Sequence, residues 1–186
     1  MARRPTLTEY AVLGLLSMGE KSGYDVWRFA ERSVDFLWAP AKSQVYKVLP
    51  RLAELGLATV REVEQAGRPD KQLYAITAAG RRALAGWLEQ VDAGATPDQI
   101  QLRIFFAGQG SPDAAVRQVE AYRDVVAARL ERWRELEPRI RDAPGQRFPH
   151  RVLVQGIRSA EVDLAWAEEL LAELRRPDAG RTRRAG

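Results

Sequence analysis

The segment from Lys42 to Arg51 carries side chains that suit contact with a nucleic acid. Its polar and basic members are Lys42, Ser43, Gln44, Tyr46, Lys47 and Arg51. Lysine and arginine neutralise phosphates, serine and tyrosine hydroxyls can donate hydrogen bonds to them, and glutamine can form paired hydrogen bonds with adenine. These residue types therefore support noncovalent contact with DNA.

A helical apolar repeat runs through the same segment. The repeat consists of Val45, Val48, Leu49, Leu52 and Leu55. At about 100° per residue Val45, Val48, Leu49 and Leu52 share one face. Ser43, Lys47 and Pro50 then face away, flanked by Gln44, Tyr46 and Arg51. Pro40 suits the first turn of this helix, and Gly56 is placed to end it. An ordinary amphipathic helix would also turn charges to solvent, so the neighbouring elements must decide between the two interpretations.

A second basic group lies in a turn between two segments with strand-like patterning. Residues 57–64 and 71–76 are predicted as strands, joined by the turn-forming residues 65–70. The candidate contacts here are Gly67, Arg68 and Lys71. They could be ordinary loop charges, but a basic hairpin tip directly after three helices favours contact with DNA.

Capping residues and apolar spacing predict the helices around these two groups. Thr6 and Glu9 form a capping box before a helix of about residues 7–18, and Ser22 with Asp25 repeats the pattern before a helix that ends near Ser33. Thr77 is expected to cap a fourth helix. Three helices followed by a hairpin form a winged helix-turn-helix, in which the third helix enters the major groove. The predicted fold class is mainly α, with this domain at residues 1–90.

The C-terminal half is predicted to be helical, beyond a boundary at residues 91–95. A short helix should start at Thr96 and Pro97, a long one should run from Ser111 to Pro138, and another from Phe148 to Arg175. Residues 96–176 would form a domain for dimerisation and possibly for effector binding. The apolar stripes assigned to dimerisation include Val119, Tyr122, Val126, Trp133, Leu153, Ile157, Leu164 and Leu171. The same stripes could instead pack only within one subunit.

Other functional residues are few. Trp133 and Trp166 are candidates for a pocket that binds a small aromatic or apolar effector, although core packing is the commoner role of tryptophan. The single histidine, His150, has no cysteine or second histidine to complete a metal site. The sequence also holds no nucleophile motif, phosphate loop or dinucleotide fingerprint. We therefore predict no enzyme activity, no metal and no cofactor.

Composition agrees with a DNA-binding protein of the cytoplasm. The chain of 186 residues has a net charge of +4 and no cysteine, which excludes disulfides and thiolate metal sites. No apolar run is long enough to span a membrane, and the N-terminal residues do not form a secretory signal. Residues 177–186 are expected to form a basic flexible tail.

Several sequence motifs together resemble those of the PadR-type transcriptional regulators. The matching stretches are Leu13-Gly14-Leu15-Leu16, Ser22-Gly23-Tyr24-Asp25, residues 38–46, residues 51–57 and residues 67–81. The resemblance covers nearly the whole chain. It implies a homodimer held by C-terminal helices and a repressor that leaves its operator when a small molecule binds.

One position departs from the family pattern. Many members have a proline directly after the tyrosine of the third helix, whereas this chain has Lys47 there and Pro50 three residues later. Proline lacks an N–H group, so Pro50 should remove the bond to the Tyr46 carbonyl and bend the helix. The alternative to a DNA-binding regulator is a winged-helix module that binds another protein instead of DNA.

Overall fold

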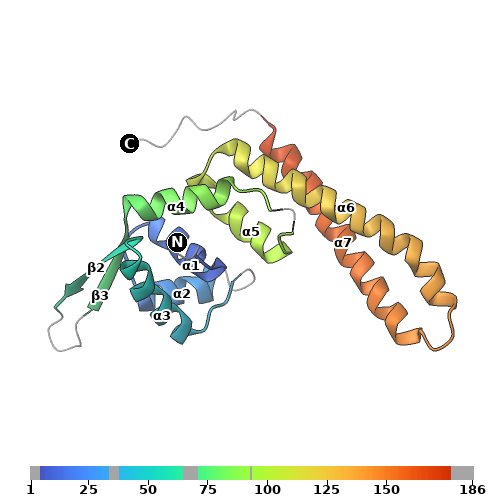
Figure 1. Ribbon diagram of the computed structural model, residues 1–186, viewed down its shortest axis with the longest axis horizontal. Coiled ribbons are helices and arrows are strands. Elements are labelled where there is room, and N and C mark those ends of the chain that lie inside the picture. Colours follow the sequence, from blue (N-terminus) through green and yellow to red (C-terminus); the bar gives the residue numbers. More distant parts are fainter. Residues whose placement is uncertain (1–4, 34–37, 65–70, 93, 177–186) are drawn as a thin grey trace. The chain divides into compact units, whose positions relative to one another are not determined.

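The computed structural model describes residues 5–33, 38–64, 71–92 and 94–176 (Figure 1). The chain divides into two compact units. The N-terminal unit comprises residues 1–90 and 98–114, and the C-terminal unit comprises residues 91–97 and 115–186. In the described parts of both units, no helix is long and apolar enough to cross a membrane.

The N-terminal unit has the predicted winged helix-turn-helix fold. Its elements are α1 (Leu7–Ser17), β1 (Lys21–Ser22), α2 (Gly23–Ser33), α3 (Lys42–Glu54), β2 (Ala58–Val63), β3 (Lys71–Ile76), α4 (Ala78–Glu89), α5 (Pro97–Phe105) and the 3-10 turn η1 (Ala107–Gln109). The strands form one antiparallel sheet in the order β1-β3-β2. The hairpin of β2 and β3, here called the wing, extends beyond the helices of this unit (Figure 1).

Side-chain caps fix where the helices begin. Thr6 Oγ1 accepts a hydrogen bond from the Glu9 backbone, and the Glu9 carboxylate accepts one from the Thr6 backbone, as the capping box predicts. Thr77 caps α4 by accepting from the Gly80 backbone at 3.0 Å. The predicted helices and strands of this unit are therefore confirmed to within a few residues.

A stack of three side chains joins α1, α4 and α5. The rings of Tyr10 and Trp87 lie 4.8 Å apart and within 9° of parallel. The Arg103 guanidinium lies 4.6 Å from the centre of the Trp87 ring and donates hydrogen bonds to the carbonyls of Trp87 (2.5 Å) and Gln90 (2.6 Å). Arg103 thus bonds to carbonyl groups at the C-terminal end of α4.

The helix α5 belongs to the N-terminal unit, whereas the sequence placed it in the C-terminal domain. Phe106 is 2% exposed and packs against Gly14 of α1, where an added Cβ would lie only 2.5 Å from the ring. This contact and the Arg103 hydrogen bonds connect residues far apart in the sequence, so helical periodicity did not reveal them. The functional division at residues 90–96 remains a prediction.

In the N-terminal unit the prediction for Pro40 was wrong, the position of Pro50 within the third helix was correct, and one short strand was missed. Pro40 precedes the N-cap residue Ala41 and is not part of the first turn of α3. Pro50 lies inside α3, which continues to Glu54. The strand β1 was not predicted, because two residues carry no periodic signal. It forms by pairing Lys21 with Tyr74 and Ser22 with Leu73.

The C-terminal unit is built mainly from two long helices, α6 (Pro112–Asp142, whose first residues belong to the N-terminal unit) and α7 (Arg147–Leu174). They pack antiparallel, with Glu120 bonded to Arg175 near one end and Glu137 bonded to His150 near the other. The sequence prediction ended the first of these helices at Pro138, but it continues to Asp142. Proline removes a single backbone donor, and Arg139 and Arg141 favour the negative C-terminal end of the helix.

Candidate nucleic-acid interface

The polar face of α3 is exposed and rigidly supported. Val45, Leu49 and Leu52 are at most 1% exposed, while the predicted contact residues are all exposed. These residues are Lys42, Ser43, Gln44, Tyr46, Lys47 and Arg51. The structure therefore brings all six to one accessible helix surface, as the spacing predicts.

The six residues differ in their contacts within the chain. Gln44 Nε2 donates to Thr8 Oγ1 at 3.2 Å, and Arg51 pairs with Glu54 at 3.2 Å. Among the described residues, Ser43 and Lys47 have no hydrogen-bond or ion-pair partner. These two side chains are available to a partner without breaking a bond within the part of the chain that the structure describes.

In the wing, Lys71 is held by an ion pair. Its ammonium nitrogen lies 3.0 Å from Asp25 Oδ2, and the same oxygen accepts hydrogen bonds from the Ser22 backbone and hydroxyl. Partial burial of Asp25 opposes its ionisation, but the hydrogen bonds from Ser22 and Lys71 and the charge of Lys71 outweigh it and lower the Asp25 pKa. A DNA contact by Lys71 stays a prediction. Gly67 and Arg68 lie outside the described residues.

A second ion pair anchors the wing strand β2. Arg61 donates to both carboxylate oxygens of Glu20, at 2.7 and 2.5 Å, and the Arg61 hydrogen bond lowers the Glu20 pKa. The pairs Glu20–Arg61 and Asp25–Lys71 thus tie both wing strands to the segment that begins α2. Sequence reasoning missed the first pair and the role of Asp25 in the second, because their partners meet only once the β1-β3-β2 sheet is formed.

The predicted dimerisation residues pack largely against the other helix of the same chain. Val119, Tyr122, Val126 and Leu171 are at most 4% exposed, and the other four, Trp133, Leu153, Ile157 and Leu164, are half-buried. Tyr122 makes an edge contact with Trp166, with ring centres 6.2 Å apart. The four buried residues of the predicted set therefore belong to the core of the C-terminal unit within one chain.

A different apolar stripe of α7 is exposed. Phe148, Val152 and Val162 are 76%, 71% and 69% exposed. Their spacing of 4 and 10 residues places them within a sector of about 80° on the helix, and the buried Ala160, Ala167 and Leu171 lie in a different sector. Sequence reasoning chose the denser stripe and missed this one, although the same projection would have revealed it.

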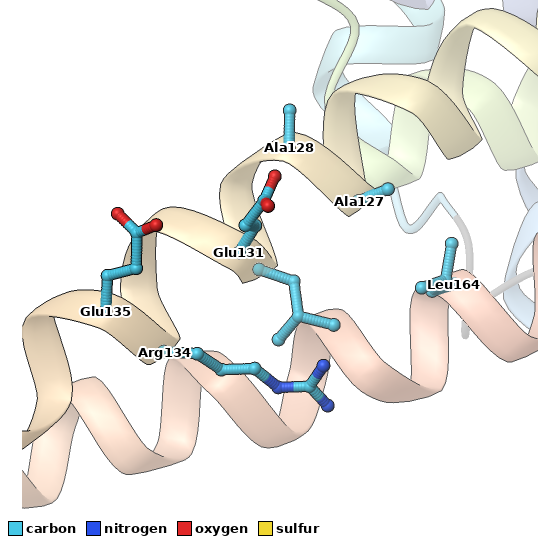
Figure 2. A pocket seen from close by; sticks show the side chains of 7 residues that line it. Ala127, Ala128, Glu131, Arg134, Glu135 and Leu164 are labelled. Carbon is cyan, nitrogen blue, oxygen red and sulfur yellow. The ribbon is translucent and has the colours of Figure 1, made fainter.

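The two tryptophans proposed for an effector each pack on a residue of the other long helix, and their effector role stays a prediction. Trp133 packs on Gly156, where an added Cβ would lie 3.2 Å from the indole, and Trp166 packs on Tyr122. A groove of about 700 Å³ in the C-terminal unit is lined by Leu130, Leu164, Glu131 and Arg134 among others (Figure 2). Leu164 comes from α7 and the remaining lining residues come from α6 (Figure 2).

The one histidine serves a structural contact. His150 Nε2 lies 2.5 Å from Glu137 Oε1, so it joins the N-terminal end of α7 to the C-terminal end of α6. In the described ranges, no group of three or more histidine, cysteine or acidic residues could hold a metal ion.

Two families match the chain over separate segments. Residues 12–86 match the transcriptional regulator PadR-like family, and residues 98–175 match the family described as virulence activator alpha C-term. The chain is 29% identical over 181 residues to the probable transcriptional regulator Rv1176c of Mycobacterium tuberculosis. This alignment covers 89% of this chain and 96% of that protein. It is 33% identical over 100 residues to the negative transcriptional regulator PadR of Bacillus subtilis. That alignment covers 53% of this chain and 55% of the relative.

Crystal structures of Bacillus subtilis PadR are also similar. The complex with operator DNA has a TM-score of 0.46 and 26% identity, covering 91% of this chain and 99% of that one. The complex with p-coumaric acid has a TM-score of 0.42 and 25% identity, covering 95% and 100%. The two family matches and the relative that spans most of the chain agree with the resemblance seen in the motifs. Residues 12–86 of this chain form a domain of the PadR-like family of transcriptional regulators.

Proposed function

We propose that this protein is a ligand-responsive repressor that binds a pseudo-palindromic DNA operator as a homodimer. The observation that carries the proposal is the exposed polar face of α3, supported from behind by the buried Val45, Leu49 and Leu52. In a helix-turn-helix, this third helix occupies the major groove, and its outward side chains meet base edges and phosphates. Residues 1–90 would then act as the DNA reader.

The homodimer is proposed to form through residues 96–176. The exposed stripe of Phe148, Val152 and Val162 supports this assignment, because large apolar side chains that share an exposed face often mark an interface. The half-buried residues of the predicted set, such as Leu164, could extend the contact at its edge. Two readers related by a twofold axis would bind half-sites about 34 Å apart, which is one turn of DNA.

The effector is proposed to shift the relative geometry of the C-terminal helices and thereby the spacing of the two α3 helices. The groove beside Leu130 and Leu164 supports a small, mainly apolar ligand in this region, because its lining combines apolar side chains with the charged Glu131, Arg134 and Glu135 (Figure 2). Bacillus subtilis PadR is a relative that binds p-coumaric acid, which is a small aromatic acid.

The direct test is a fluorescence anisotropy titration against the protein's own upstream region and against a scrambled duplex, each at two salt concentrations. We expect tight, salt-sensitive binding that prefers the upstream region. A folded dimer that binds neither duplex would refute the proposal and favour a protein-binding module. Equal operator affinity with and without every ligand that binds would refute the effector part alone.

A further inference from the structure

Five side chains form an aromatic and basic cluster where α2 meets the start of α3. The cluster consists of Tyr24, Trp27, Arg28, Lys42 and Tyr46. The Lys42 ammonium lies 5.8, 5.3 and 5.9 Å from the centres of the Tyr24, Trp27 and Tyr46 rings. The Arg28 guanidinium lies 5.7 Å from the Tyr24 ring centre. Both cations therefore lie within 6 Å of the centre of the Tyr24 ring.

Helical spacing and one glycine assemble the cluster. Tyr24, Trp27 and Arg28 follow each other at intervals of three and one on α2, and Lys42 and Tyr46 are four apart on α3, so each set shares a helix face. At Gly23 an added Cβ would lie 3.1 Å from the Tyr46 ring. The glycine therefore lets the Tyr46 ring lie close to the first turn of α2.

The charges of the cluster are not compensated. Within the described part of the chain, neither Arg28 nor Lys42 has an acidic partner, although both lie near the same ring. Tyr24 and Tyr46 stay 41% and 48% exposed, so the rings do not serve mainly to fill the core. Two like charges beside the same ring repel each other, and an anion bound near them would relieve that repulsion.

The Tyr24 hydroxyl adds a hydrogen-bond donor to this surface. It accepts a hydrogen bond from Arg28 Nη1 at 2.7 Å, which fixes its oxygen. A tyrosine hydroxyl has one proton of its own to donate, and among the described residues this proton has no acceptor. The cluster thus offers an ammonium, a guanidinium and a hydroxyl, which together suit one phosphate group.

We propose that this cluster binds one phosphate of the DNA backbone, an inference that rests on the DNA binding proposed above. In a helix-turn-helix the helix before the recognition helix crosses the backbone, and the cluster lies on that helix and at the start of α3. Lys42 is then a backbone contact rather than a base reader. Tyr24 and Arg28 become DNA contacts that the helical pattern of α3 did not identify.

A phosphate contact and a base contact leave different signatures. Loss of a phosphate contact weakens binding to every duplex by a similar factor and reduces the slope of log affinity against log salt by about 1. Loss of a base contact changes the preference for the operator over other sequences. The two roles of Lys42 can therefore be separated by affinity measurements alone.

The test measures the salt slope and the operator preference of Lys42→Met, Lys42→Arg and Tyr24→Phe, with Arg158→Met on α7 as a control for the loss of one charge. We expect Lys42→Met to lower the slope by about 2, because each subunit of the homodimer loses one phosphate contact, and to keep the preference for operator over scrambled duplex. Lys42→Arg should restore the slope. Tyr24→Phe should weaken binding to both duplexes equally, and Arg158→Met should leave the slope within error of wild type.

Operators that each carry a single methylphosphonate locate the phosphate. At one position in each half-site, removal of the phosphate charge should weaken the wild type but leave Lys42→Met unaffected. A change in operator preference in Lys42→Met would overturn the inference while leaving DNA binding intact. So would an unchanged salt slope, if the effects of Lys42→Met and of the methylphosphonate were additive at every position. Failure of the folded wild type to bind either duplex would instead refute DNA binding itself, and the inference with it.

Discussion

Lys71 Nζ lies 3.0 Å from Asp25 Oδ2, so the first residue of wing strand β3 is paired with the first turn of α2. Asp25 also accepts hydrogen bonds from the Ser22 backbone and hydroxyl, while its own backbone donates to Ser22 Oγ. The same carboxylate therefore caps α2 and positions the wing. The removal of Asp25 should affect both elements.

We expect Asp25→Ala to lower the free energy of unfolding by about 1 kcal/mol, which is typical for the loss of a helix cap. Urea denaturation followed by circular dichroism measures this change. Asp124→Ala is a matched control, because Asp124 is exposed and, among the residues that the structure describes, pairs only with its neighbour Arg123. That control should change stability by less than about 0.5 kcal/mol. Equal losses in the two variants would contradict the role of Asp25.

The same carboxylate should make stability depend on pH. The Asp25 pKa is lowered from its ordinary value of 3.8 in the folded protein. Its stabilising contribution is therefore complete above about pH 5 and is lost as the pH falls through the ordinary value towards the folded pKa. We expect the stability difference between wild type and Asp25→Ala to shrink below about pH 4. A difference that stays constant from pH 7 to pH 3 would show that the charge of Asp25 is not responsible.

Gly14→Ala should destabilise the N-terminal unit. The new Cβ would lie 2.5 Å from the Phe106 ring, so the ring must move out of a site where it is 2% exposed. Overpacking of this kind costs about 1–3 kcal/mol. At Gly86 on α4 an added Cβ meets nothing within 4 Å, so Gly86→Ala should instead stabilise the protein by about 0.5–1 kcal/mol. Thermal unfolding of the two variants should thus shift in opposite directions.

A second variant separates overpacking from other effects of Gly14→Ala. Phe106→Leu in the Gly14→Ala background replaces the ring with a smaller side chain and should recover part of the lost stability. Phe106→Leu alone should be destabilising because it leaves a cavity. If the double variant is as unstable as the sum of the single variants, the clash with Phe106 is not the cause.

Arg103→Met should destabilise the contact between α4 and α5. Arg103 is 6% exposed and donates to the carbonyls of Trp87 and Gln90, which the variant would leave without this donor. The loss of such charged hydrogen bonds in a buried site costs about 2–4 kcal/mol. Urea denaturation measures the loss, and Arg158→Met on the exposed face of α7 serves as the control. A loss no larger than that of the control would argue against this role.

The exposed stripe of α7 gives a prediction for the oligomeric state. A charge at the centre of an apolar interface must lose its hydration without gaining a partner. We therefore expect Val152→Glu to raise the dimer dissociation constant at least tenfold in analytical ultracentrifugation. Ala172→Glu adds the same charge at an exposed position on another side of α7 and should have little effect. A Val152→Glu protein that dimerises as tightly as this control would exclude the stripe from the interface.

Periodicity and capping predicted most of the fold because those signals are local. Thr6 and Glu9 lie three residues apart, and the apolar repeat of α3 fixes which side faces the core. The strand β1 and the packing of Phe106 on Gly14 depend on residues distant in the sequence, so no local pattern contained them.

The candidate site was likewise predicted only where a local pattern contained it. Helical projection identified the exposed face of α3, including Lys47 and Tyr46, because it depends on that helix alone. It did not identify Tyr24 or Arg28, since they join the cluster only after α2 packs against α3. Apolar stripes likewise do not specify whether a helix packs within its own chain or on a second copy. The buried Val119 and the exposed Val152 look alike in the sequence.

The two ion pairs of the wing also restrict how this protein can evolve. Glu20 with Arg61, and Asp25 with Lys71, each join a residue at or just before the start of α2 to a residue of the wing. A mutation that reverses the charge of one member places two like charges together until its partner also changes. Among close relatives, positions 20 and 61 should therefore covary, as should positions 25 and 71, and a wing transplanted from another regulator should need the matching residues of α2.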